Sequence, residues 1–167
     1  MTHGGGREPT GRIDVRPVHP VRILHISRNV ANRRELQRLL QSTNWELTQV
    51  FSLEEAVLHF QQTAAEYSVV MSERVMPTPR WKTRFARTDR LWTLPMFIVT
   101  APMGETRCWA EALSAGADDV IATPFERGEL VWVVREAHLA WLRHIADRQG
   151  AREGLSVYRP GSTRKAS

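Results

Sequence analysis

The sequence predicts an α/β fold in which a parallel β-sheet is covered by helices on both faces. Short β-prone runs alternate five times with helix-like segments, and short links join them. The 167 residues, 42% hydrophobic and 25% charged, suffice for one domain with an ordinary core, and no internal repeat competes with that interpretation. We therefore expect a single doubly wound α/β domain.

The expected strands are short apolar runs, and several expected helices begin or end at recognisable signals. Asn29 precedes apolar residues at helical spacing, Ser52 and Glu55 form a capping box, and Gly116 is placed to end a helix. Strands are expected at 21–26, 45–51, 68–72, 96–100 and 119–122. Helices are expected from 29, from 52, in the basic segment with Trp81 and Phe85, at 105–115 and at 126–149.

The two ends of the chain differ in composition from the segment between them. Residues 1–20 are rich in Gly, Pro and Arg, and residues 149–167 are basic. We expect a flexible leader at 1–20, a domain at 21–148 and a flexible basic tail at 149–167. The single cysteine, Cys108, indicates a reducing compartment, and no apolar run predicts a signal peptide or membrane span. The expected location is the cytoplasm.

The net charge of +5 raises the question of a polyanionic partner. Basic residues gather between Arg80 and Arg90 and again in the tail. A nucleic-acid-binding protein that uses these two segments is therefore one alternative function. The simpler interpretation is a solvated surface and a flexible end, because charge runs are usually solvated.

The polar residues that follow the strands are the first candidates for a functional site. In doubly wound sheets, ligands bind in the crevice beyond the carboxyl ends of the strands. The residues at those ends are Ser27 and Arg28, Glu73, Thr100, and Thr123 with Pro124. His25 lies inside the first apolar run, where a core histidine is the simpler interpretation.

Four segments carry a family resemblance: VRILHISRN, SVVMSERVMPT, LPMFIVTA and SAGADDVIATPFERGEL. In this order and at these separations they resemble the signature segments of the response-regulator receiver domain of two-component systems. The resemblance covers about residues 21–148. It implies a flavodoxin-like (βα)5 sandwich with a five-stranded parallel sheet in the order 2-1-3-4-5.

The resemblance also implies a role for each strand-end position. The family has an acidic pair that holds magnesium where this chain has Ser27 and Arg28, and a phosphoacceptor aspartate where it has Glu73. A hydroxyl residue and a lysine that contact the phosphoryl group correspond to Thr100 and Thr123. Only Thr100 keeps the family's residue type. The aromatic switch residue corresponds to Val120, and Pro124 keeps the family's proline.

These substitutions predict a receiver-like domain that acts without phosphorylation. A hydroxyl and a guanidinium do not supply the carboxylate oxygens that magnesium prefers, so we expect no metal and no cofactor. Loss of the metal and the lysine removes the charges that assist phosphoryl transfer. Arg28 either pairs with Glu73 as a fixed salt bridge, or both side chains point into water; the sequence leaves these two arrangements open.

The last expected helix carries more apolar residues than one buried face requires. Val131, Trp132, Leu139 and Leu142 fall outside the stripe assigned to the core. Because receivers commonly pair through their last two helices, the resemblance implies a homodimer or a protein partner there. A helix covered by the chain's own tail is the alternative.

Motifs for enzymatic chemistry are absent from the sequence. It contains no Walker loop, dinucleotide-binding glycine motif, nucleophile elbow or zinc-protease motif, so no enzyme class is predicted. The expected function is a phosphorylation-independent, receiver-like signalling module that acts through protein contacts. The alternatives are a conventional phosphate-accepting receiver that uses Glu73 and the nucleic-acid-binding protein described above.

Overall fold

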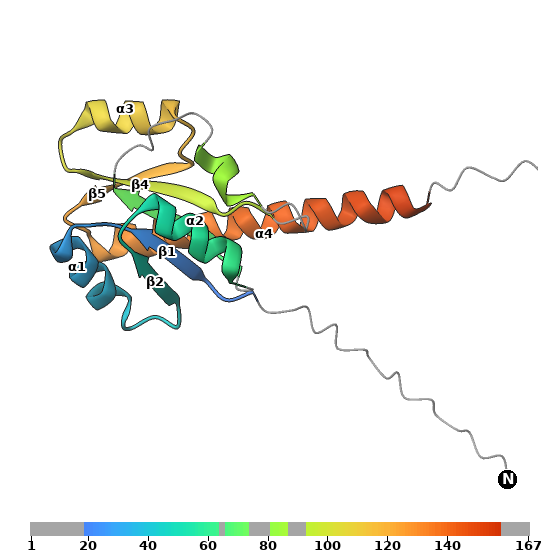
Figure 1. Cartoon of the computed structure of the whole chain (residues 1–167), viewed down its shortest axis with the longest axis horizontal. Helices are drawn as coiled ribbons and strands as arrows, with labels where there is room; N and C mark the ends of the chain where they lie inside the picture. The colour runs from blue at the N-terminus through green and yellow to red at the C-terminus, as the bar shows by residue number, and fades with distance from the viewer. Residues whose placement is uncertain (1–18, 64–65, 74–80, 87–92, 158–167) are drawn as a thin grey trace, which may run out of the picture.

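Five parallel strands form the centre of the fold (Figure 1). A computed structural model describes residues 19–63, 66–73, 81–86 and 93–157, with side chains as far as residue 151. The strands are β1 (Arg22–Ile26), β2 (Glu46–Val50), β3 (Val69–Glu73), β4 (Met96–Pro102) and β5 (Asp119–Thr123). Their order is β2-β1-β3-β4-β5, and every neighbouring pair is parallel, which confirms the predicted sheet.

Helices cover both faces of this sheet. They are α1 (Val30–Leu40), α2 (Leu53–Gln62), the short 3₁₀ helix η1 (Trp81–Phe85), α3 (Thr106–Ser114) and α4 (Arg127–Val157). Two of the predicted helix signals are confirmed. Asn29 caps α1 through its side chain, and the Ser52 side chain accepts a hydrogen bond from Glu55 at the start of α2. Gly116 follows α3 with a φ of +95°, a conformation that favours glycine.

One face of the sheet packs against α1 and α4. Because side chains alternate along a strand, every second residue of β1, β3, β4 and β5 points to this face. Its core contains strand residues such as Ile23, Met71 and Ile98, with Leu36 from α1 and Leu130 from α4. We call this side of the sheet the α1/α4 face.

The opposite face is covered by α2, η1 and α3. Its largest core cluster is rich in aromatic residues: Phe60, Tyr67, Trp81, Phe85 and Phe97. A smaller cluster joins Ala112 of α3 to Val99, Ala101 and Val120 of β4 and β5. We call this side the α2/α3 face.

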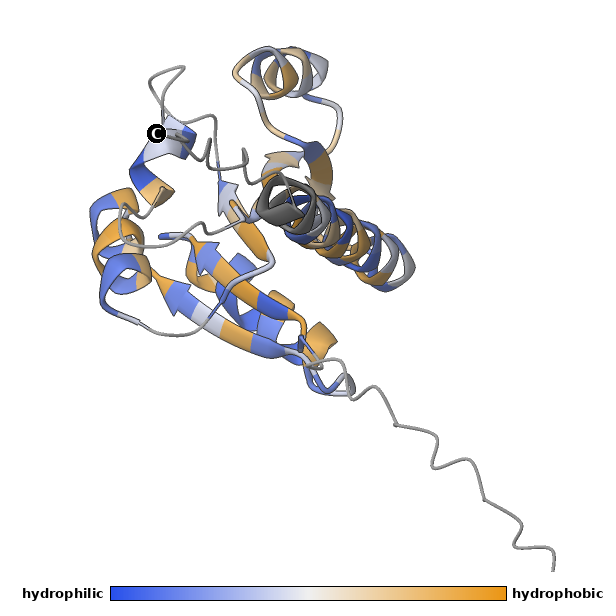
Figure 2. Cartoon of the chain, turned by 90° about the vertical axis from the view of Figure 1, so that its right-hand side faces the viewer, coloured by the Kyte–Doolittle hydropathy of each residue, from blue (hydrophilic) through white to orange (hydrophobic). Residues whose placement is uncertain are grey.

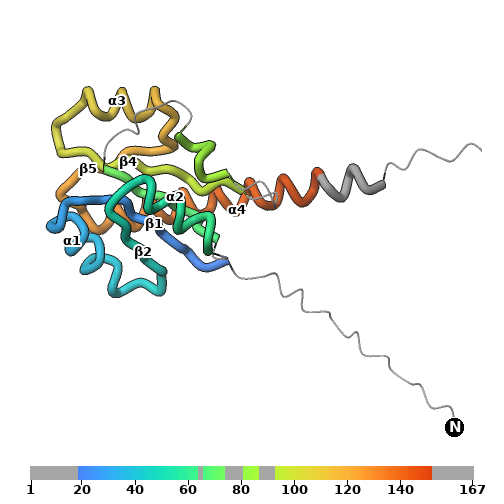
Figure 3. The backbone as a smooth tube through the Cα atoms, in the orientation of Figure 1, coloured from blue at the N-terminus to red at the C-terminus, as the bar shows by residue number. Residues whose placement is uncertain are grey.

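Two predicted helices differ from those observed. The basic segment forms only the five-residue η1 among its described residues, because Trp81 and Phe85 are drawn into the aromatic cluster and the Trp81 ring donates to Ala115 O at 3.2 Å. The last helix does not end at Gln149. It continues to Val157, so residues 149–157 of the predicted tail are helical (Figure 1). The coloured part of α4 in Figure 3 already extends past the sheet.

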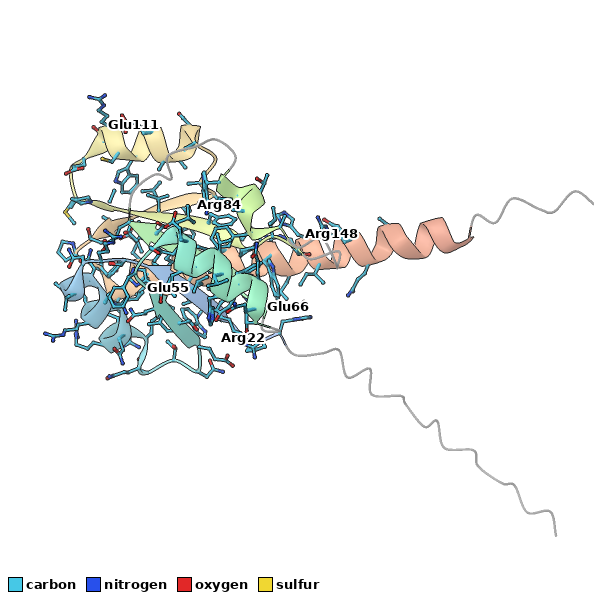
Figure 4. The ribbon with its side chains drawn as sticks, in the orientation of Figure 1. Arg22, Glu55, Glu66, Arg84, Glu111 and Arg148 are labelled. Atoms are coloured by element: carbon cyan, nitrogen blue, oxygen red, sulfur yellow. The ribbon has the colours of Figure 1, made fainter. Side chains whose placement is uncertain are left out.

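Residues 1–18 of the predicted leader and 158–167 of the predicted tail lie outside the described residues. The first described residue, His19, contacts Glu66 Oε2 through its Nδ1 at 3.2 Å. Figure 4 shows Glu66 near Arg22, at the amino end of the strands, and Glu55 at the opposite end. None of the described helices is long and apolar enough to cross a membrane.

Candidate functional site

The predicted strand-end residues converge at the carboxyl edge of the sheet. Glu73 pairs in register with Thr100, and Pro102 pairs with Thr123, so these side chains leave the sheet on the α1/α4 face. They line a pocket of about 470 Å³ beside the start of α1. The pocket is lined by Asn29, Ala31, Asn32, Glu35, Glu73, Thr100, Pro102, Thr123 and Pro124. We call it the strand-end pocket.

Two uncharged groups hold the Glu73 carboxylate. The Ser27 hydroxyl donates to Glu73 Oε1 at 2.6 Å, and the Asn32 side-chain amide donates to the same oxygen at 2.7 Å. Among the described residues no lysine or arginine nitrogen lies within 4.0 Å of this carboxylate. Glu73 is therefore fixed by hydrogen bonds to neutral groups, and its second oxygen receives no hydrogen bond from the part of the chain described.

The turn between β1 and α1 explains this arrangement. Ser27 Oγ accepts a hydrogen bond from Asn29 N at 3.0 Å, and the Asn29 side chain accepts from the backbone of Ala31 and Asn32 at 2.9 and 3.1 Å. The capped first turn of α1 thereby places Asn32 above the end of β3. The sequence analysis did not identify Asn32 as a site residue. Its position three residues after the N-cap Asn29, on the first turn of the helix, was the available signal.

Arg28 does not pair with Glu73. Its side chain is exposed, and its Nε lies 3.4 Å from Phe51 O, on the side of β2. Of the two arrangements left open by the sequence, the salt bridge is absent and Arg28 points away from the pocket. Arg33, on α1, joins the ends of β1 and β2: its Nη1 donates to Ser27 O and Val50 O at 3.1 and 3.0 Å. The central carbon of its guanidinium lies 4.1 Å from the Phe51 ring centroid.

Thr100 brings a second kind of polar group to the strand-end pocket. Its side chain is only 4% exposed, and its Oγ1 has no hydrogen-bond partner in the part of the chain that the structure describes. Thr123 and Pro124 line the same pocket from the end of β5. Two groups that lack hydrogen bonds from the described residues therefore belong to residues lining the same pocket: the second oxygen of Glu73 and the Thr100 hydroxyl.

Comparisons with known proteins address the fold. No protein-family model matches the sequence, and no curated protein matches it either. The signal receiver domain of an HD-domain protein from Pseudomonas fluorescens superposes with a TM-score of 0.65 at 18% identity, covering 80% of this chain and 98% of that chain. A chemotaxis response regulator of Vibrio cholerae gives 0.56 at 16% identity, covering 71% and 98%.

A third similar structure is the receiver domain of a sensor histidine kinase from Pseudomonas aeruginosa. It has a TM-score of 0.56 at 20% identity and covers 71% of this chain and 98% of that chain. This chain has the fold of a response-regulator receiver domain. The receiver domain from the kinase was solved with magnesium coordinated in its active-site cleft. We therefore compared the donor atoms at the strand ends of this chain with those that magnesium prefers.

Among the described residues, the donor atoms at this edge of the sheet differ from those that magnesium prefers. Magnesium requires near-octahedral oxygen ligation and is usually held by one or two carboxylates. Here the end of β1 supplies the Ser27 hydroxyl and the exposed Arg28. The Ser27 hydroxyl already donates its hydrogen bond to Glu73. Glu73 Oε1 already accepts two hydrogen bonds. The described residues contain no group of three or more His, Cys, Asp or Glu side chains that could hold a metal.

Val120 faces away from the strand-end pocket. It is 4% exposed and packs with Val99, Ala101 and Ala112 on the α2/α3 face. Val120, which the sequence resemblance aligns with the family's aromatic switch residue, is thus a small core side chain.

The basic segment is partly neutralised where the structure describes it. Lys82 Nζ lies 3.1 Å from Asp118 Oδ2, and Arg84, labelled in Figure 4, lies 3.7 Å from Glu54 Oε1. Arg80, Arg87 and Arg90 lie outside the described residues. The observed ion pairs therefore give no support to a continuous basic surface for nucleic acid.

The surplus apolar residues of α4 are only partly covered in this receiver fold. Trp132 is 61% exposed and Leu139 is 39% exposed, whereas Val131 and Leu142 are half-buried. Figure 2 shows hydrophobic and hydrophilic residues interspersed along α4. One helical side of α4 thus presents a tryptophan and a leucine seven residues apart to solvent.

His25 is a core residue, as expected, but its bonds are incomplete. It is fully buried on the α1/α4 face, and its Nδ1 lies 3.2 Å from the side-chain amide of Gln49, while its Nε2 has no partner. Burial lowers the pKa of His25 to about 4, and the nearby charge of Arg33 acts in the same direction. The imidazole is therefore neutral at physiological pH.

Proposed function

We propose that this chain is a two-component signalling module that works without phosphorylation, through protein contacts of its receiver fold. The observation that carries the proposal is that the Glu73 carboxylate accepts hydrogen bonds from Ser27 and Asn32. We take Glu73 as the equivalent of the family's phosphoacceptor, as the sequence resemblance implies. The similar receiver structures support the signalling class.

The chemistry of the strand-end pocket argues against phosphoryl transfer to Glu73. Such transfer depends on cations that neutralise the charge on the phosphoryl oxygens. The described pocket contributes two carboxylates, Glu35 and Glu73, and no cationic side chain. An incoming phosphoryl group would meet like charges and a carboxylate whose Oε1 already accepts two hydrogen bonds.

A phosphodonor experiment tests this part of the proposal. The full chain is incubated with acetyl phosphate and magnesium chloride, and its intact mass is measured beside that of Glu73→Gln. We expect no added phosphoryl mass in either protein. A mass increase of one phosphoryl group that disappears in Glu73→Gln would establish the conventional receiver instead.

The exposed apolar side of α4 supports a protein interface, either a homodimer or a docked partner. Large apolar side chains are costly to leave in water, and tryptophan is enriched among residues that dominate binding energies. Trp132 and Leu139 are the exposed members, and Val131 and Leu142 flank them. We assign the interface to these four residues and to α3, the other of the last two helices, which packs like α4 against the edge strand β5.

Light scattering across a concentration series tests the homodimer. We expect a dimer that Leu139→Ala weakens by about tenfold, since an interface residue of this kind contributes about 1.4 kcal/mol or more. Leu58→Ala is the matched control, because Leu58 is a 54% exposed leucine on α2. If the protein is a monomer at every concentration, the homodimer is wrong and the interface binds a different protein.

The same proposal includes two expectations about the whole molecule. We expect the module to have no catalytic turnover of its own and to reside in the cytoplasm. Duplex DNA titrated at two salt concentrations tests the nucleic-acid alternative: weak binding at low salt that vanishes at physiological salt fits our proposal, whereas sequence-dependent binding that persists would contradict it.

A further inference from the structure

The strand-end pocket combines three observations that the proposed signalling role does not use. Thr100 lines the pocket and is 4% exposed, and its Oγ1 has no hydrogen-bond partner among the described residues. Glu73 keeps one carboxylate oxygen that receives no hydrogen bond from any described residue. Glu35 adds a second carboxylate to the lining. Unpaired buried polar groups are rare in native structures and call for a partner.

The charges of the described lining disfavour an anionic partner. Among the described residues that line the pocket, both ionisable ones are glutamates. The positive end of α1 does not offset them, because Asn29 Oδ1 already accepts hydrogen bonds from Ala31 N and Asn32 N at 2.9 and 3.1 Å. The partner that complements this lining is therefore a cation.

The kind of oxygen available separates an organic cation from a metal ion. A hard divalent ion would require several carboxylate or carbonyl oxygens in a rigid shell, and Glu73 Oε1 is already committed to Ser27 and Asn32. A primary ammonium group needs only three acceptors for its three N–H donors. Glu73 Oε2, Thr100 Oγ1 and the Glu35 carboxylate supply three acceptors from three elements.

We propose that the strand-end pocket binds a primary ammonium group through Glu73, Thr100 and Glu35. Glu73 supplies the opposing charge within the pocket, and Thr100 supplies a neutral acceptor from the neighbouring strand. The volume of about 470 Å³ admits an alkylammonium chain as well as its head. The source of the group is either a lysine side chain of a protein partner or a free alkylamine.

The mouth of the pocket is compatible with either source. Val30 is 56% exposed in the first turn of α1, next to the lining residues Asn29 and Ala31. An apolar residue beside the entrance suits the methylene chain that carries an ammonium head. The proposal does not depend on the α4 interface.

The test is a nuclear magnetic resonance titration of the full chain with n-butylammonium chloride at constant ionic strength. The Thr100 and Thr123 methyl signals report on the pocket. We expect saturable shifts of both signals. Tetramethylammonium, which carries the same charge without an N–H donor, should produce no saturable shift; equal shifts with both ions would overturn the proposal.

Two variants and one control assign the binding to the named groups. Glu73→Gln removes the charge but keeps an acceptor for Ser27 and Asn32, and should weaken butylammonium by about tenfold. Thr100→Val is nearly isosteric and should weaken it by about fivefold. Glu54→Gln removes an exposed carboxylate on α2 and should change nothing. Unchanged affinity in Glu73→Gln, or an equal loss in the control, would overturn the proposal.

Further titrations distinguish the sources and the remaining rival. If Nα-acetyl-lysine methylamide binds as tightly as butylammonium, the source of the ammonium group is a lysine of a partner protein. If putrescine binds about tenfold more tightly than either of these compounds, the source is a free diamine. If magnesium chloride shifts the same signals and neither amine has an effect, the pocket binds a metal ion and the ammonium proposal is overturned.

Discussion

The two faces of the sheet bury different kinds of side chain. On the α2/α3 face, the largest cluster packs the rings of Trp81, Phe85 and Phe97, with centroid separations of 4.4 Å for Trp81–Phe97 and 5.3 Å for Phe85–Phe97. On the α1/α4 face, the side chains of His25, Thr100 and His138 are buried with an unpaired nitrogen or oxygen atom. The three belong to β1, β4 and α4.

The difference separates the contribution to stability from the contribution to function. Close-packed rings stabilise the fold through burial and edge contacts, whereas each unpaired polar atom lowers stability. A chain under selection for stability alone would have replaced such polar residues by apolar ones of similar shape. Of these three residues, only Thr100 lines the strand-end pocket.

The largest expected effect comes from the aromatic face. Phe97 is 1% exposed, and Phe97→Ala should lower the free energy of unfolding by about 3–5 kcal/mol, because it leaves a cavity between two other rings. Urea denaturation measures the change. Phe51→Ala is the matched control: Phe51 is 55% exposed and contacts mainly Arg33, so about 1 kcal/mol is expected. Equal losses in the two variants would contradict the proposed difference between the faces.

His25 gives the polar face a dependence on pH. Burial lowers its pKa from 6.5 to about 4, so between these values the unfolded chain binds a proton that the folded chain does not. Stability should therefore fall as the pH drops below about 6.5 and level off near 4 for this group. From pH 7.5 to pH 5 the expected loss is about 2 kcal/mol.

Urea denaturation at the two pH values checks this effect. His25→Leu should remove most of it, although His138 of α4 contributes in the same direction because burial also lowers its pKa. His144→Gln, a change at an exposed histidine of α4, is the control. A pH dependence that His25→Leu leaves intact would mean that other groups are responsible.

The elements that the sequence predicts correctly are those fixed by local signals. The five strands come from short apolar, β-prone runs, and α1 and α2 begin at side chains that cap them, Asn29 and Ser52. The predicted end of α4 at Gln149 was wrong. Gly150 lies within the helix and does not have a positive φ, and glycine inside a helix costs only about 1 kcal/mol.

The parts of the site that could not be predicted depend on the direction of side chains. Opposite charges at two strand ends suggested a pair between Arg28 and Glu73, but the turn after β1 directs Arg28 toward Phe51 O. The partner that reaches Glu73 is Asn32, one turn into α1. Nor does a sequence show that the Thr100 hydroxyl is unpaired, since this depends on every residue packed around it.

The smallest expected effect concerns the two arginines nearest to the end of β1. Arg28 is exposed and makes one long hydrogen bond, at 3.4 Å, so Arg28→Ala should change the free energy of unfolding by less than about 0.5 kcal/mol. Arg33 joins the ends of β1 and β2 through Ser27 O and Val50 O, so Arg33→Ala should cost about 2 kcal/mol. Thermal and urea denaturation of both variants measure the contrast.

A double-mutant cycle of Arg28→Ala with Glu73→Gln completes this test. The coupling energy should lie within about 0.3 kcal/mol of zero, because the two side chains share no contact in the structure. A coupling above about 1 kcal/mol would mean that Arg28 swings across the strand-end pocket to pair with Glu73 in solution. That result would place a cation of the chain itself where we propose an external ammonium group, and butylammonium would then bind more tightly to Arg28→Ala than to the wild type.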